Sequence, residues 1–179
     1  MHRNQLIKLL KEYSDDVKTR TQILDFVNAH PDCFERTNIY GHITSSSWLL
    51  SNDLSKVLLT HHRKLDKWLQ PGGHCDGDSN VPASALREAV EESGIQKWEF
   101  LSQEIFDLDV HRIPARKQDP EHFHFDVRFV FKATDSEDYI VSEGSHDLAW
   151  VPLREIQQYT NEVSIMRMVE KSGRFSKVN

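Results

Sequence analysis

Residues 72–95, GGHCDGDSNVPASALREAVEESGI, form the stretch that decides the fold, because a glycine pair, a polar loop and a helix follow one another in it. The Pro-Gly-Gly sequence that leads into it predicts a sharp backbone turn. A helix is expected over residues 81–93, since Ser79 or Asn80 can cap its first turn. Gly94 suits the left-handed position just past the last turn. The stretch therefore predicts a loop that leads into a helix with defined ends.

Before this stretch, the chain is expected to begin with helices and then change to strands. Apolar residues recur at helical spacing over residues 5–30, with a break near Asp15-Asp16. His30-Pro31 ends this region, because the residue before a proline avoids the helical conformation. We therefore expect an N-terminal helical extension over residues 1–40, followed by the main domain over residues 41–179.

The remaining elements indicate the fold class. Runs rich in β-branched and aromatic residues predict strands, and helical periodicity returns at the end of the chain. We expect strands at residues 43–50, 56–60, 100–110, 123–132 and 148–151, a loop at 112–121, and helices at 153–158 and 162–171. This order predicts an α/β chain of the α+β type with a mixed or largely antiparallel sheet.

Composition limits the classes of function. The 179 residues include 22 Lys and Arg against 28 Asp and Glu, a net charge of −6, so neither a nucleic-acid polymer nor an acidic membrane is an expected partner. A small anionic substrate is compatible with this charge, because a bound cation reverses the local sign. Cys33 and Cys75 cannot form a disulfide framework, and no apolar run is long enough to span a membrane. We expect a cytoplasmic protein.

Three glutamates of the expected helix carry the chemistry. Glu88, Glu91 and Glu92 are spaced i, i+3 and i+4, so they share one helical face, and Arg87 can brace Glu91 from one turn away. An acidic face of this kind is commonly just solvated. Here, however, the carboxylates repel one another, and two of them lie in the last turn, where the helix dipole disfavours anions. A hard divalent cation such as Mg²⁺ would offset both effects.

These residues resemble the Nudix box, GX5EX7REUXEEXGU, in which U is a bulky apolar residue. Two positions depart from that pattern: Ser79 stands in place of the first Glu, and Ala89 is a small apolar residue. The resemblance covers about residues 41–160 and implies a Nudix-like mixed β-sheet sandwiched between helices. The matching positions are Gly73, Arg87, Glu88, Glu91, Glu92, Gly94 and Ile95.

The resemblance also implies a site and a reaction. Glu88, Glu91 and Glu92 would hold Mg²⁺ or Mn²⁺, and water would attack a diphosphate that the ion orients. Arg87 belongs to the same catalytic set. Glu143 lies between the last two expected strands, and we expect it to be either a further ligand or base, or an ordinary loop acid.

Neighbours of the box are expected at the same site. Gly72 and Gly73 have no Cβ, so their backbone can approach the phosphates or the ion closely. The first box Glu is missing, and Asp76 or Asp78 can replace it in part, while the core of three glutamates is intact. The details of metal binding therefore depend on this loop.

Substrate contacts are expected from residues outside the box acids. His74 and His124 are the histidines expected there, with Asp126 in the same cleft, while Trp68 and Phe123 can stack on a base or simply pack. The sequence shows no set of three or four converging histidines, so we expect exposed or hydrogen-bonded histidines rather than a zinc site. Basic residues of the loop at 112–121 can clamp phosphates or be solvated: Arg112, Arg116 and Lys117.

Together these features predict a Mg²⁺-dependent hydrolase that cleaves the diphosphate (pyrophosphate) linkage of a nucleoside-diphosphate-linked or related small molecule. A non-catalytic ligand-sensing or interaction module on the same fold is the first alternative, although such modules often lose the box acids. A diphosphate isomerase would be expected to have a cysteine before the first box glycine, where this chain has Gly72. The N-terminal extension can cover the cleft or form a homodimer surface.

Overall fold

Two helices precede the sheet, as the sequence predicts. The computed structural model describes residues 2–175. Helix α1 (Asn4–Glu12) and helix α2 (Val17–Ala29) are separated by the expected break. The Asp16 carboxylate caps α2 by accepting a hydrogen bond from the Thr19 backbone N–H at 3.0 Å. This cap explains why the chain starts a second helix here.

The sheet has eight strands and is mixed, which confirms the expected fold class. β1 runs parallel to β7 over ten residue pairs, whereas the other pairings are antiparallel. The central path is β3-β2-β1-β7-β5, with β4 paired to β1, β6 to β7 and β8 to β2. The strands are β1 (Gly41–Leu50), β2 (Lys56–His62), β3 (Lys67–Leu69), β4 (Gly72–His74), β5 (Trp98–Phe100), β6 (Asp107–Ile113), β7 (His122–Ala133) and β8 (Ser145–Pro152).

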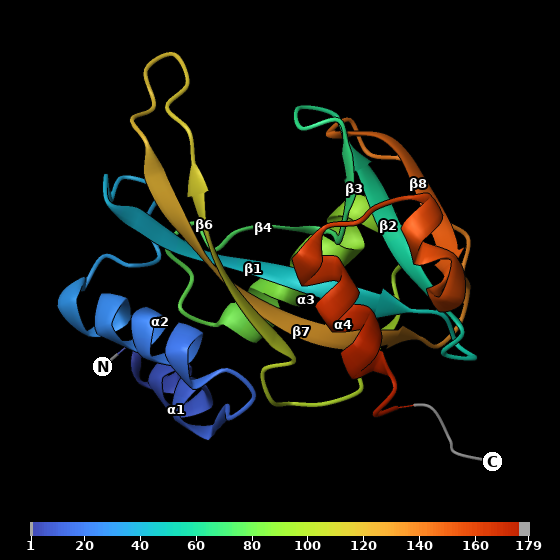
Figure 1. Ribbon diagram of the computed structural model, residues 1–179, viewed down its shortest axis with the longest axis horizontal. Coiled ribbons are helices and arrows are strands. Elements are labelled where there is room, and N and C mark those ends of the chain that lie inside the picture. Colours follow the sequence, from blue (N-terminus) through green and yellow to red (C-terminus); the bar gives the residue numbers. More distant parts are fainter. Residues whose placement is uncertain (1, 176–179) are drawn as a thin grey trace.

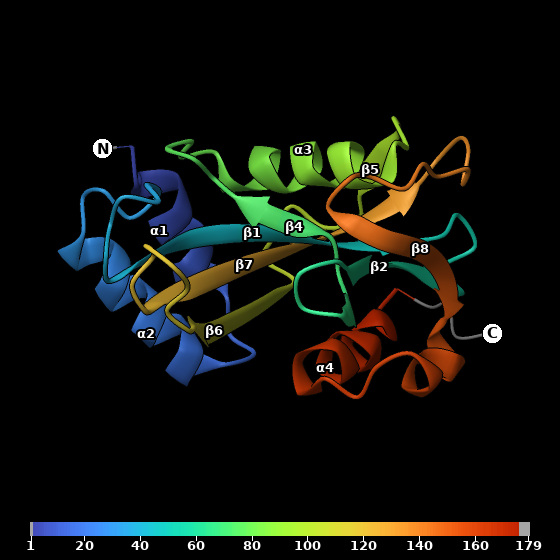
Figure 2. The same cartoon turned by 90° about the horizontal axis from the view of Figure 1, so that it is seen from above.

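Helices flank the sheet on both sides (Figure 2). Helix α3 (Val81–Ser93) lies on one side, and the 3₁₀ helix η1 (Leu153–Gln158) with helix α4 (Val163–Ser172) lies on the other. Helices α1 and α2 lie at the end of the sheet far from β8 (Figure 1). The sandwich of helices around a mixed sheet is therefore confirmed.

The N-terminal helices share a hydrophobic core with the sheet and α3. Phe26 of α2 stacks on Phe125 of β7, with ring centroids 3.9 Å apart and an interplanar angle of 9°. Leu6 and Leu10 of α1 are fully buried in the same cluster. A second cluster lies beneath α4 and η1. The boundary at residue 40 stays a prediction, because the core is continuous across it.

Two details of the sheet differ from the sequence prediction. The single strand expected at 100–110 is two strands, β5 and β6, because the chain leaves the sheet between them. Gly72 and Gly73 form strand β4 against Ser46 and Ser45 of β1 rather than a sharp turn. A Cβ on Gly72 would collide with Ser46, so this pair allows two strands to approach closely.

The end of α3 follows the sequence prediction. Gly94 has a φ of 73°, the left-handed conformation expected past the last turn. Asn80 rather than Ser79 caps the first turn, accepting a hydrogen bond from the Ala83 backbone N–H at 3.2 Å. The helix that carries the glutamates is therefore defined at both ends by local interactions.

A buried carboxylate connects β6, β7 and α4. The Asp107 side chain is inaccessible to solvent and accepts hydrogen bonds from Arg128 at 3.1 Å, from Arg167 at 2.7 and 2.8 Å and from Lys171 at 2.8 Å. Lys171 also donates to the Tyr13 hydroxyl at 2.7 Å. The network therefore joins the segment between α1 and α2 to the last helix.

We expect Asp107→Ala to lower the free energy of unfolding by about 3–5 kcal/mol, because it leaves buried cations without their partner. Urea denaturation measures the change. The matched control is Asp135→Ala, which removes an exposed ion pair with Lys97 and should cost less than about 1 kcal/mol. Equal losses in the two variants would contradict a structural role for Asp107.

Candidate functional site

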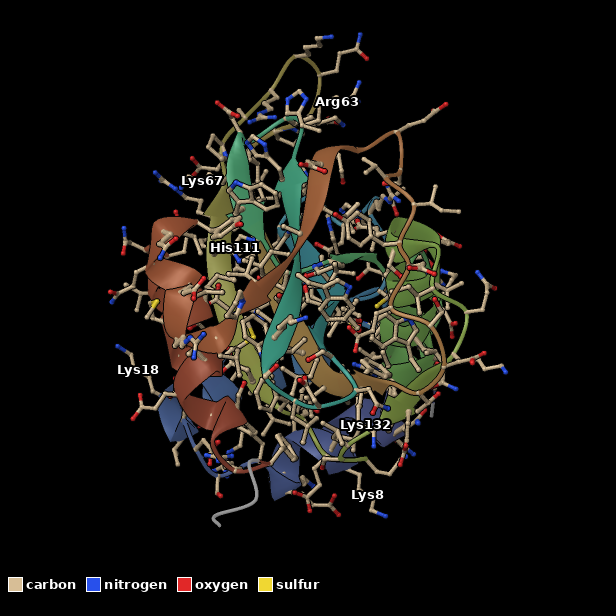
Figure 3. All side chains as sticks on the ribbon, turned by 90° about the vertical axis from the view of Figure 1, so that its right-hand side faces the viewer. Lys8, Lys18, Arg63, Lys67, His111 and Lys132 are labelled. Carbon is tan, nitrogen blue, oxygen red and sulfur yellow. The ribbon has the colours of Figure 1, made fainter. Side chains whose placement is uncertain are left out.

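Two of the three box glutamates line the main cavity of the molecule. Glu88 and Glu92 project from α3 into a cavity of about 530 Å³, whereas Glu91 is exposed and lies 3.9 Å from the Arg87 guanidinium. Lys67 and His111 line the same cavity on the α4 side of the sheet (Figure 3). The structure therefore brings Glu88 and Glu92 together and leaves Glu91 at the surface.

The glycines of β4 make room for these carboxylates. A Cβ on Gly73 would lie 2.5 Å from a Glu88 carboxylate oxygen, so any larger residue would displace that side chain. Arg87 donates to the His74 carbonyl at 3.0 Å and to Glu88 at 3.4 Å. Arg87 thus holds α3 against β4 and orients the glutamate beside it.

The electrostatics of the two carboxylates favour a bound cation. Burial raises the pKa of Glu92 to about 8, the neighbouring Glu88 adds to the shift, and a hydrogen bond from the Gly72 backbone opposes it. Burial also raises the pKa of Glu88. One Glu92 oxygen is buried without a hydrogen-bond partner. An oxygen-binding divalent cation would supply the missing interaction, so the donor set fits Mg²⁺ or Mn²⁺.

The opposite wall of the cavity is polar and fixed by hydrogen bonds. Asp126 of β7 accepts from the hydroxyls of Thr44 and Ser46 at 2.8 and 2.9 Å and from Arg128 at 2.7 Å. Burial favours a higher pKa for Asp109, but a hydrogen bond from His111 and the charge of Arg128 outweigh it and hold that pKa at about 2. This wall therefore presents an ionised Asp109 beside an Asp126 carboxylate that hydrogen bonds hold in place.

Three histidines also converge at the cavity. One ring nitrogen from each of His42, His74 and His124 lies within 4.8 Å of the others. Burial lowers the pKa of His42 and of His74 to about 4. The expectation of an exposed or hydrogen-bonded histidine is wrong for His42, which is 3% exposed and has no hydrogen-bond partner at either ring nitrogen. His74 and His124 are half-buried.

His42 and His111 are site residues that no motif in the sequence marks. His42, Thr44 and Ser46 are two residues apart on β1, so their side chains share one face. The intervening Ser45 and Ser47 are polar as well, so no alternation of polar and apolar residues marked this face in the sequence. The partner strands were needed to show what the face contacts.

Several expected site residues lie elsewhere. Trp68 stacks on His61 with ring centroids 5.0 Å apart, and neither it nor the exposed Glu143 is among the described residues that line the cavity. Asp76 forms an ion pair with Arg36, and Asp78 accepts from the Asn80 backbone at 2.8 Å. Arg112 lies near the end of β6, whereas Arg116 and Lys117 lie on the loop that follows it. This loop projects beyond the sheet between β6 and β7 (Figure 1).

A family model described as the NUDIX domain matches residues 42–171. The chain belongs to the NUDIX family. A search of curated proteins finds no significant match. Within the described residues, no helix is long and apolar enough to cross a membrane.

Solved structures of other proteins share the fold at low sequence identity. An Ap4A hydrolase binary complex from C. elegans has 16% identity and a TM-score of 0.59, covering 74% of this chain and 96% of that chain. The MutT protein from Methanosarcina mazei has 19% identity and a TM-score of 0.58, with 77% and 96% covered. The NUDIX domain of Shewanella oneidensis NrtR, complexed with ADP ribose, has 20% identity and a TM-score of 0.53, with 84% and 96% covered.

We expect the pH dependence of stability to reveal the buried Glu92 carboxyl. Its folded-state pKa of about 8 lies above its ordinary value of 4.5, so the unfolded chain releases this proton first and stability falls as pH rises between these values. In EDTA, the free energy of unfolding of wild type should fall by roughly 2 kcal/mol more than that of Glu92→Gln when the pH is raised from 6 to 8.

Urea denaturation at pH 6, 7 and 8 measures this difference. Glu104→Gln, at an exposed glutamate, is the matched control and should follow wild type. Parallel pH profiles for wild type and Glu92→Gln would contradict the raised pKa.

Proposed function

We propose that this NUDIX protein is a Mg²⁺- or Mn²⁺-dependent hydrolase that cleaves a diphosphate linkage in a nucleoside-diphosphate-linked or related small molecule. The observation that carries the proposal is the half-buried Glu92 carboxylate, one oxygen of which is buried without a hydrogen-bond partner, in the cavity that Glu88 also lines. A carboxylate pair in this position is costly unless it binds a cation. The family match supports the same reading.

Glu88 and Glu92 would hold the cation, and Glu91 would join them from the exposed face of α3. When bound, the ion neutralises phosphate charge and lowers the pKa of a coordinated water. Gly73 leaves the space that the Glu88 carboxylate occupies, and Arg87 keeps that carboxylate oriented. These residues therefore form the catalytic set of the proposal.

The proton of the attacking water would pass to a box carboxylate. Glu88 and Glu92 are inside the cavity, whereas Glu143 is exposed and outside its lining. Arg36 and Lys67 also line the cavity and would attract the phosphates of the substrate. His74 and His124 would contact the substrate from the sheet side.

A cysteine-dependent diphosphate isomerase has less support. Cys75 is buried, and burial raises its pKa to about 12. A buried thiol of this kind is a poor nucleophile or acid–base group. A non-catalytic ligand-sensing module stays an alternative, and activity measurements distinguish it from the hydrolase.

A panel of dinucleoside polyphosphates, sugar nucleotides, ADP ribose and nucleoside triphosphates tests the proposal, with and without Mg²⁺ or Mn²⁺. We expect turnover of at least one member only when the cation is present. Product analysis in ¹⁸O-labelled water identifies the phosphorus that is attacked. Tight binding of one member without turnover of any would favour the sensing module instead.

We expect Glu88→Gln and Glu92→Gln to lower kcat by at least about 10²-fold, because each removes a charge that stabilises the reacting centre. Circular dichroism and thermal melts establish that both variants fold. Glu104→Gln, at an exposed site away from the cavity lining, should keep wild-type kcat. Full cation-dependent activity in Glu92→Gln would overturn the assignment.

A further inference from the structure

A row of histidines crosses four neighbouring strands on the cavity side of the sheet. In the sheet, His42 of β1 is the register partner of His124 of β7, and His124 is the register partner of His111 of β6. On the other side of β1, Thr44 is paired with His74 of β4. Because His42 and Thr44 are two residues apart, they share a face. The pairing therefore places these imidazoles next to one another on one face of the sheet.

Three members of the row have the geometry of a ligand set. The ring centroids of His42 and His74 are 4.9 Å apart, those of His42 and His124 are 4.9 Å apart, and those of His74 and His124 are 5.1 Å apart. One nitrogen of each ring lies within 4.8 Å of the other two. Tetrahedral Zn–N bonds of about 2.0–2.1 Å place the ligand nitrogens about 3.4 Å apart. Side-chain rotations that shorten these separations by up to about 1.4 Å would bring the nitrogens to that spacing.

The buried position of His42 independently points to a missing ligand. Its side chain is 3% exposed, and neither ring nitrogen has a hydrogen-bond partner. A buried polar group without a partner is unfavourable unless a ligand completes its interactions. The nearby histidines outside the trio are different, since His111 bonds to Asp109 at 3.1 Å and His122 to the Pro120 carbonyl at 2.9 Å.

We propose that His42, His74 and His124 bind one divalent transition-metal ion, Zn²⁺ being the ion whose chemistry fits best. Imidazole nitrogens suit Zn²⁺ and related ions, whereas Mg²⁺ requires oxygen ligands. The histidine site is therefore chemically distinct from the carboxylate pair of Glu88 and Glu92, although both face one cavity. It does not depend on the proposed hydrolase activity.

The site leaves one coordination position for a ligand from the cavity. His74 and His124 line the cavity, whereas His42 lies behind them in the sheet. Three protein ligands with an open fourth position are the arrangement that lets zinc bind water or a substrate oxygen. A phosphate or hydroxyl oxygen of a substrate is the chemical class that this position would accept.

Isothermal titration of the full-length protein with Zn²⁺ tests the proposal, in millimolar Mg²⁺ to occupy the carboxylate site. We expect one Zn²⁺ per chain in wild type, and at least about 100-fold weaker binding in His74→Ala and His124→Ala, since each removes a ligand. His146→Ala, at an exposed histidine of β8 outside the cavity lining, and Glu92→Gln should keep wild-type zinc affinity.

A measurement on wild type avoids any effect of substitution on folding. We expect the imidazole ¹⁵N resonances of three histidines to move to metal-bound positions when Zn²⁺ is added, and Co²⁺ to give the intense visible absorption of a low-coordinate site. Folded wild type that binds no zinc would overturn the proposal. So would zinc binding that Glu92→Gln abolishes and the histidine variants retain. A wild type that binds zinc through these histidines but hydrolyses no member of the substrate panel would count against the proposed function alone.

Discussion

The buried carboxylate of Asp107 is the charge that positions helices from both ends of the chain. Taking a carboxylate out of water costs several kcal/mol unless cations and hydrogen bonds compensate it. Here the compensation comes from Arg128 of β7 and from Arg167 and Lys171 of α4. Lys171 also binds the Tyr13 hydroxyl, so the last helix and the N-terminal helices are positioned by one interaction.

The same charges determine the shape of the cavity. Arg128 binds Asp126 as well as Asp107, and Asp126 accepts the hydroxyls of Thr44 and Ser46 on β1. This chain of contacts fixes the polar wall opposite Glu88 and Glu92. A ligand in the cavity therefore meets carboxylates of α3 on one side and the polar face of β1 and β7 on the other.

Sequence patterns could predict those helices and strands whose ends are set by residues adjacent to them in the chain. Helix α3 begins at the Asn80 cap and ends at Gly94 in the left-handed conformation, and both signals lie within the helix or beside it. Strand β4 could not be predicted this way, because two of its three residues are glycines and its pairing with β1 is a long-range contact. For the same reason, the sequence could not predict that the chain leaves the sheet between β5 and β6.

The sequence by itself determined the fold class, the helix that carries Glu88, Glu91 and Glu92, and the acidic character of the candidate site. The fold class follows from the order of helices and strands along the chain, whereas the helix and its acidic face follow from capping and spacing within residues 72–95. Only the tertiary structure decided that Glu91 is exposed, that Glu143 lies away from the cavity, and that three histidines meet. The physical reason is that His42, His74 and His124 come from three strands, and strand pairing alone sets which side chains of distant segments face one another.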